Sequence, residues 1–404
     1  MIDKPIWVIV GTRPEVIKQA ALYNALKNKF GQDKVALIGT GQHRELLTTA
    51  LEQFDLKLDY NFDLMSEAQT PAEIAAKIIL KFNEIFSNSS RSATKDAKPK
   101  WVIVQGDTTT AAMAAWVSFL NKINVIHNEA GLRTCDLYNP FPEEANRKII
   151  SSIATLHLAP TIRARDVLTR EGVSADKIFV TGNTGIDAFR LMLNKQIPEN
   201  IKRIIKDNQN KNNRSIVLLT AHRRESEGEP VIRWFENLKE FVNKHSDLHI
   251  IYPMHPNNVA RPWAKKILND HPQISLLEPL NYLQTVHAIA NSRFVITDSG
   301  GIQEEAATIN IPVVVCRKVT ERMEAVDAGI AKLTSFDSKE FFETLEWAND
   351  LGKKFQNNNQ DNNQKNKQNK TLLPNNIYGD GFSSEKIAQI LYDQYDQYDL
   401  YENH

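Results

Sequence analysis

The chain has 404 residues, of which 42% are hydrophobic and 24% charged, a composition that argues against a disordered chain or a disulfide scaffold. Because a single hydrophobic core stops growing at roughly 250–300 residues, the length predicts two domains. Lys and Arg number 49 and balance 49 Asp and Glu, so no global positive field would draw the protein to nucleic acid or to an anionic membrane. Any anion must therefore be bound locally.

The cysteines and the N-terminus bear on the compartment. Cys135 and Cys316 lie far apart and outside any C-x-x-C pattern, which favours neither a disulfide framework nor a zinc site and fits a reducing cytoplasm. The N-terminal apolar run 6–10 is too short to span a membrane and is not followed by a signal-peptide cleavage pattern. We therefore expect a cytoplasmic protein with no membrane segment.

In the first half of the chain, short β-branched runs alternate with longer segments of helical periodicity, which is typical of βαβ units and a parallel sheet. The predicted strands are 6–10, 34–39, 101–104, 123–127, 155–158 and 177–181, and the predicted helices begin near 14, 44, 71, 109, 143, 161 and 184. These elements predict a Rossmann-like domain over residues 1–185.

The second half repeats this pattern after a polar stretch at 194–214. The predicted strands are 215–220, 247–251, 273–277, 293–297 and 312–316, followed by a helix at about 337–349. They predict a second Rossmann-like domain over 186–382. Within it, the almost purely polar segment 356–370 has too few apolar residues to offset its ordering entropy and is predicted to be a mobile loop. A last helix from Ser384 to about Gln397, with Ser383 or Ser384 as N-cap, is expected to pack back on the first domain as part of 383–404.

The loops after the strands of the first domain are polar. Ligands of parallel sheets lie beyond the carboxyl ends of the strands, so these loops are the candidate site. Arg13 and Lys18 flank a predicted helix N-terminus, which favours an anion. Asp107, Glu129 and Glu143 are expected to converge at one end of the sheet, where repulsion and partial burial can raise a carboxyl pKa toward working pH. The cluster suits proton transfer; a magnesium site is the alternative, ranked lower because neighbouring cations already serve a phosphate.

The second domain offers groups for a phosphate-bearing ligand. His222 follows its first strand and precedes paired arginines. Ser299, Gly300 and Gly301 open a predicted helix and present a hydroxyl and free backbone N–H groups to a diphosphate. About one turn later, Glu305 could accept hydrogen bonds from ribose hydroxyls.

Six motifs, taken together, resemble those of the non-hydrolysing UDP-N-acetylglucosamine 2-epimerases, over residues from about 6 to the C-terminal helix. They are Gly11-Thr-Arg-Pro-Glu15, Gln105-Gly-Asp-Thr-Thr109, Glu129-Ala-Gly-Leu-Arg-Thr134, Pro142-Glu-Glu-Ala-Asn-Arg147, His222-Arg-Arg-Glu225 and Asp298-Ser-Gly-Gly-Ile-Gln-Glu-Glu305. Six motifs in the order of the family are far more specific than any one of them.

The resemblance implies a glycosyltransferase-B-like α/β fold with the active site in the interdomain cleft, and a homodimer. It implies conversion of UDP-N-acetylglucosamine to UDP-N-acetylmannosamine, a precursor of bacterial surface polysaccharides, through a glycal and with neither NAD nor another cofactor or metal. Carried over by motif, the acid and base residues are Asp107, Glu129 and Glu143, with His222 assigned to both catalysis and binding. The residues implied to hold UDP are Arg13, Lys18, His222, Ser299, Gly300, Gly301, Glu305 and Arg322.

Other functions are open on the sequence. A hydrolysing relative would release free N-acetylmannosamine, and a close relative could epimerise a modified UDP-N-acetyl sugar. A glycosyltransferase would need an acceptor site and no carboxylate cluster. A UDP-sugar sensor could dispense with the three carboxylates.

Overall fold

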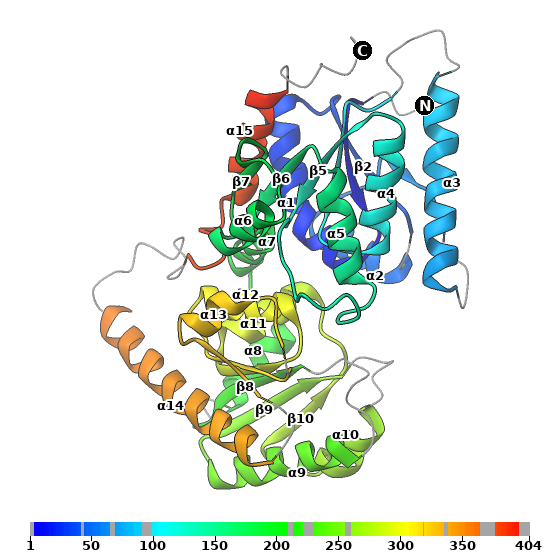
Figure 1. Cartoon of the computed structure of the whole chain (residues 1–404). Helices are drawn as coiled ribbons and strands as arrows, with labels where there is room; N and C mark the ends of the chain where they lie inside the picture. The colour runs from blue at the N-terminus through cyan, green and yellow to red at the C-terminus, as the bar shows by residue number, and fades with distance from the viewer. Residues whose placement is uncertain are drawn as a thin grey trace. The chain divides into compact units, whose positions relative to one another are not determined.

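The computed structural model describes residues 4–41, 44–64, 69–90, 98–208, 213–220, 229–254, 260–317, 319–334, 338–363 and 376–395. The chain divides into two compact units, Met1–Ala188 with Tyr378–His404 and Phe189–Ile377. The change from the first unit to the second therefore falls inside α7 (Thr184–Leu193), just before the polar stretch that follows it. Each unit is built from one parallel sheet covered by helices (Figure 1).

The first unit has a seven-stranded sheet in the order β3-β2-β1-β4-β5-β6-β7, and all neighbouring strands are parallel. Its strands are β1 (Ile6–Val10), β2 (Val35–Gly39), β3 (Tyr60–Asn61), β4 (Trp101–Gln105), β5 (Asn124–Asn128), β6 (Leu156–Ala159) and β7 (Ile178–Val180). All six predicted strands are present, and β3 is an additional two-residue edge strand. The carboxyl ends of β4 and β5 lie side by side, in register from Trp101 with Asn124 to Gln105 with Asn128.

Helices cover both faces of this sheet because β1 alternates its side chains between them. Ile6, Val8 and Val10 belong to a core cluster with α1 and the C-terminal helix α15, whereas Trp7 and Ile9 belong to a cluster with α3 and α4. The helices of this unit are α1 (Arg13–Phe30), α2 (Arg44–Gln53), α3 (Pro71–Ser90), α4 (Thr109–Leu120), α5 (Glu143–Ile153), α6 (Ile162–Arg170), α15 (Ser383–Gln394) and the first part of α7.

The C-terminal helix α15 is held to the first unit at its N-terminus and along its apolar face. Ile387 and Leu391 are fully buried in the cluster that contains α1. The predicted serine N-cap is wrong: the N-cap is Phe382, and the backbone N–H groups of Ser383 and Ser384 donate to the carboxylate of Asp187 at 3.1 and 2.5 Å. Burial raises the pKa of Asp187. A carboxylate from α7 therefore satisfies the first amides of a helix almost 200 residues further along the chain.

The second unit has a six-stranded parallel sheet in the order β10-β9-β8-β11-β12-β13. Its strands are β8 (Ser215–Thr220), β9 (Leu248–Pro253), β10 (Ile274–Leu277), β11 (Ser292–Thr297), β12 (Val313–Val315) and β13 (Ala331–Leu333). Its helices are α8 (Glu199–Lys206), α9 (Glu229–Lys244), α10 (Arg261–Leu268), α11 (Tyr282–Ala290), α12 (Gly300–Thr308), α13 (Met323–Asp327) and α14 (Ser338–Asn363).

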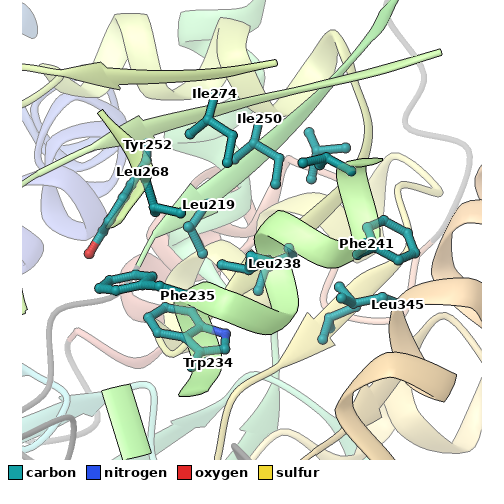
Figure 2. Packing of buried hydrophobic residues seen from close by; sticks show 14 of the residues in the cluster. Leu219, Trp234, Phe235, Leu238, Phe241, Ile250, Tyr252, Leu268, Ile274 and Leu345 are labelled. Atoms are coloured by element: carbon teal, nitrogen blue, oxygen red, sulfur yellow. The ribbon is translucent and has the colours of Figure 1, made fainter. Parts of the chain in front are cut away.

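One side of the second sheet is closed by α9, α10 and α14 around a dense apolar core (Figure 2). Trp234 and Phe235 of α9 stack with their ring centroids 4.9 Å apart, and both side chains are fully buried. The core continues to Phe341 and Leu345 of α14. The predicted loop 356–370 is wrong for 356–363, which continue α14, because a helix already anchored by these buried residues extends through polar residues at low cost. Residues 364–370 lie outside the described ranges.

Candidate active site

The turn between β1 and α1 is organised by Glu15, a buried carboxylate in the first turn of α1. Its Oε2 accepts hydrogen bonds from the backbone N–H groups of Gly11 and Thr12 at 2.9 and 2.7 Å and from the Thr12 hydroxyl at 2.8 Å. Its Oε1 accepts one from the Thr108 hydroxyl at 2.6 Å, which ties this turn to the loop after β4. Burial raises the pKa of Glu15, and the four hydrogen bonds oppose that rise. Arg13 begins α1 at this turn and is half-buried.

Glu129 follows the carboxyl end of β5 and is paired with Lys18 of α1. The Lys18 Nζ lies 2.5 and 2.6 Å from the two carboxylate oxygens, and the Glu129 side chain is 5% exposed. The amide Nε2 of Gln105 donates to Glu129 Oε2. Glu129 has φ 64°, a left-handed conformation that costs energy for a residue with a side chain and is found preferentially at functional sites. The structure thus places Lys18 against a carboxylate.

Asp107 lies after β4 and has its own cationic partner. Arg147 of α5 places Nη2 2.5 Å from Asp107 Oδ2, and the Asp107 side chain is 26% exposed. The backbone carbonyl of Asp107 accepts from the Asn146 side chain at 2.8 Å. The preceding Gly106 has φ 67°, a left-handed conformation that favours glycine in the tight turn that presents Asp107. Asp107 is therefore fixed by α5 through both its side chain and its backbone.

The two acids at the start of α5 have different surroundings. Glu144 is fully buried and accepts from the backbone N–H groups of Thr134 and Cys135 at 3.1 Å each and from Arg147 at 2.9 Å. It holds the loop after β5 in place. Glu143 is the first residue of α5, and its Oε2 is buried without a hydrogen-bond partner among the described residues. A buried, unpartnered carboxylate oxygen is the kind of group that a bound substrate would satisfy.

The three predicted acids therefore come from neighbouring elements but have separate partners. Asp107 pairs with Arg147 and Glu129 with Lys18, whereas Glu143 has an open oxygen. Within the described ranges, no group of three or more His, Cys, Asp or Glu residues is placed to hold a metal ion.

Two histidines lie beneath these loops, on β5 and β6. His127 and His157 are directly opposite each other in the strand register. Burial lowers the pKa of His127 to about 3 and that of His157 to about 4, so both are neutral near pH 7. The His127 Nε2 lies 2.8 Å from the carbonyl oxygen of Gly106, to which a neutral imidazole donates. His127 thus supports the turn that carries Asp107.

The candidate diphosphate loop of the second unit lies at the N-terminus of α12. Ser299 is the N-cap, and its backbone N–H donates to the Thr297 hydroxyl at 3.0 Å. A Cβ atom at Gly300 would lie 2.5 Å from the guanidinium carbon of Arg322, whereas a Cβ at Gly301 would meet nothing within 4 Å. The close approach of Arg322 therefore requires a glycine at position 300 only.

Arg322 and Glu305 are both buried beside this loop. The Arg322 Nε lies 3.0 Å from Glu304 Oε1, and its Nη1 contacts Glu321. Glu305 Oε1 accepts a hydrogen bond from the Tyr282 hydroxyl at 2.8 Å. The structure thus brings Ser299, both glycines and Arg322 together around one helix N-terminus, and it fixes the side chain of Glu305 from α11.

His222 lies outside the described residues, which end at Thr220 and resume at Glu229. Sequence reasoning missed Gln105 and Arg147 as site residues. A signal existed for both: Gln105 is the last residue of β4 and begins the Gln105 to Thr109 motif, and Arg147 closes the Pro142 to Arg147 motif.

The family of the chain follows from comparison with known proteins. The model of the family described as UDP-N-acetylglucosamine 2-epimerase matches residues 25–392. The chain belongs to this family. It is 39% identical to the UDP-N-acetylglucosamine 2-epimerase of Bacillus subtilis over 386 residues, which cover 96% of this chain and 94% of that protein.

Solved structures of this epimerase family resemble the chain over nearly its full length. The Neisseria meningitidis UDP-GlcNAc 2-epimerase bound to UDP-GlcNAc has a TM-score of 0.81 and 33% identity, covering 96% of this chain and 99% of that one. The Methanocaldococcus jannaschii UDP-GlcNAc 2-epimerase in complex with UDP-GlcNAc and UDP has a TM-score of 0.75 and 29% identity, covering 96% and 99%. The predicted membership of the UDP-N-acetylglucosamine 2-epimerase family and the predicted pair of Rossmann-like, glycosyltransferase-B-type units are confirmed. A search of the described helices finds none with the length and apolar character needed to cross a membrane.

Proposed function

We propose that this chain catalyses the reversible epimerisation at C2 of UDP-N-acetylglucosamine to UDP-N-acetylmannosamine, without net hydrolysis, and that the product serves surface-polysaccharide synthesis in bacteria. The observation that carries the proposal is its similarity to a Neisseria epimerase bound to UDP-GlcNAc, which extends over 96% of the chain. The arrangement of the predicted acids in the first unit supports it, because a C2 epimerisation requires proton transfer on both faces of the sugar.

The proposed reaction has two stages. A base removes the proton at C2 while the bond between C1 and the diphosphate oxygen breaks, which leaves a glycal with a C1–C2 double bond and free UDP in the site. UDP then adds back at C1, and an acid delivers a proton to the opposite face of C2. The two stages are redox-neutral: UDP is returned to C1, and the proton lost from C2 is replaced by one from the acid, so the route requires no NAD.

We assign the proton transfers to Asp107, Glu129 and Glu143, with His222 as a further acid or base and UDP contact. Proton transfer needs groups within hydrogen-bond reach of the substrate. The open oxygen of Glu143 is available for such a contact, and the carboxylates of Asp107 and Glu129 are held in place by ion pairs with Arg147 and Lys18.

UDP is assigned to Arg13 of the first unit and to the N-terminus of α12 in the second. The Ser299 hydroxyl and the backbone N–H groups of Gly300 and Gly301 would receive the diphosphate, and the adjoining Arg322 would add positive charge. Glu305, already oriented by Tyr282, would accept from the ribose hydroxyls. Lys18 forms an ion pair with Glu129, so we assign it to holding that carboxylate rather than to binding the diphosphate.

The test of the function is an incubation with UDP-N-acetylglucosamine alone, followed by NMR. The expected result is an equilibrium mixture of the two UDP-sugars without added acceptor, metal or NAD. Accumulation of free N-acetylmannosamine would identify a hydrolysing enzyme. Turnover of only a modified UDP-N-acetyl sugar would identify a different epimerase.

We also propose that the chain is a homodimer that associates through the first unit. The helices α3, α4 and α5 pack successively against one another (Figure 1). Each of them carries large apolar side chains that are exposed. They are Leu80, Trp116, Phe119, Leu120 and Ile149, which are 38–69% exposed. Apolar side chains gathered on one surface mark an interaction site more often than scattered ones do.

The homodimer is testable by analytical ultracentrifugation. Phe119→Asp with Leu120→Lys is expected to convert a dimer of the wild-type chain into monomers, because charges cannot be buried unpaired in an apolar interface. Tyr392→Asp is the matched control, since Tyr392 is 50% exposed on α15 and should leave the dimer intact. A wild-type chain that sediments as a monomer would contradict the proposal.

A further inference from the structure

Glu129 is the most constrained of the assigned acids. Its backbone is in the left-handed region, and its carboxylate is almost fully buried. An ionised carboxylate at such a depth is unfavourable unless charged or polar donors surround it. Lys18 supplies the charge and contacts both oxygens.

Gln105 supplies a second donor from a different direction. It is the last residue of β4, it is 3% exposed, and its amide Nε2 donates to Glu129 Oε2. The register places Gln105 opposite Asn128, so its side chain reaches the residue that follows β5. The contact therefore depends on the pairing of two rigid central strands.

The same pair of strands holds the turn that carries Asp107. The Gly106 backbone N–H donates to the Asn128 carbonyl at 3.0 Å, and the Gly106 carbonyl accepts from His127. The β4 to β5 contacts therefore support both acids, in addition to the contacts of Asp107 with α5 and of Glu129 with Lys18. Among the described residues that make these β4 to β5 contacts, only Gln105 contacts the carboxylate of a proposed catalytic acid through its side-chain amide.

We propose that Gln105 is a positioning residue that acts through Glu129. Together with Lys18, its amide holds the Glu129 carboxylate ionised and in one orientation toward the substrate. Lys18 provides most of the electrostatic stabilisation of the Glu129 carboxylate. The neutral Gln105 amide fixes the position of Oε2 and so sets the orientation of that carboxylate. This role rests on the proposed function, because it concerns the orientation of an acid that the function assigns to proton transfer.

The variant Gln105→Met tests the role because methionine has nearly the same length and shape but donates no hydrogen bond. Loss of a donor to the charged carboxylate favours its protonated form. The expected result is a kcat lowered about tenfold or more with KM changed less than about threefold. The acidic limb of the pH profile of kcat/KM is expected to move upward by about half a pH unit or more.

Gln273→Met is the matched control. Gln273 is also a buried glutamine, and its Nε2 donates to the backbone carbonyls of His245 and Leu248 in the second unit, both at 2.9 Å. This variant is expected to melt at a lower temperature than the wild type but to keep its kcat and its pH profile. If Gln105→Met does not fold, Gln105→Glu provides the same comparison, since it keeps the shape and places a second carboxylate beside Glu129.

The outcomes separate this proposal from the proposed function. A wild-type chain that does not convert UDP-N-acetylglucosamine overturns the function itself. An active wild type with a Gln105 variant whose kcat and acidic limb match those of Gln273→Met overturns the positioning role. A lowered kcat with an acidic limb moved upward, and a KM close to that of the wild type, supports it.

Discussion

Glu143→Gln is expected to lower the rate of epimerisation about 10²–10⁴-fold, the range by which a general acid or base contributes to a reaction. The UDP affinity should change less than about threefold, because Glu143 is assigned to the sugar and not to the diphosphate. The buried Glu143 Oε2 has no hydrogen-bond partner among the described residues, so replacing it leaves no observed donor without its acceptor. Turnover by NMR and UDP binding by calorimetry are the measurements.

Glu199→Gln is a matched control for Glu143→Gln. Both glutamates are the first residue of a helix and follow a proline N-cap, Pro198 in α8 and Pro142 in α5. Glu199 is 82% exposed, so its variant loses the same favourable interaction with the helix dipole and, beyond that, only an exposed ion pair with Lys202 at 3.3 Å. Equal turnover of both variants would contradict the catalytic assignment of Glu143.

Gly300→Ala is expected to weaken UDP binding about tenfold or more and to destabilise the second unit by about 1–3 kcal/mol, as overpacking does. The added Cβ would lie 2.5 Å from the Arg322 guanidinium, which cannot move freely because Glu304 and Glu321 hold it. Displacement of Arg322 also removes positive charge from the N-terminus of α12. Calorimetry with UDP and thermal unfolding measure the two effects.

Gly301→Ala is the control for the stability effect. The two glycines are consecutive residues of α12, but a Cβ at Gly301 meets nothing within 4 Å. Alanine is the better helix former by about 1 kcal/mol, so this variant should unfold at the wild-type temperature or above it. A Gly301→Ala variant as unstable as Gly300→Ala would refute the steric explanation.

The regular elements could be predicted from the sequence, because each predicted strand is an apolar run and each helix begins at a recognisable boundary. The strands β3 and β13 were missed because neither is an apolar run: both residues of β3 are exposed, and so is the central residue of β13. Each is a strand because it pairs with its neighbour. The full extent of α14 was also missed. The polar composition of residues 356–363 predicts a loop, because it carries no information about the buried residues that anchor the preceding part of the helix.

The candidate site could be predicted as a set of loops but not as a set of contacts. Strand ends and glycines located Asp107, Glu129 and the loop at Ser299. The partners could not be found in this way, because Lys18 and Glu129 are 111 residues apart and Gln105 meets Glu129 only through the β4 to β5 register. For the same reason the pairing of Lys18 with Glu129 could not be predicted from the sequence.

In the proposed reaction the C2–H bond is broken and formed again while UDP leaves C1 and returns to it. The most direct measurement is incubation with UDP-N-acetylglucosamine in deuterated water, with the C2 position followed by NMR and mass spectrometry. The account predicts one solvent deuterium at C2 in both UDP-sugars, in the absence of acceptor, metal and NAD. Epimerisation without solvent deuterium at C2, or no conversion at all, would contradict it.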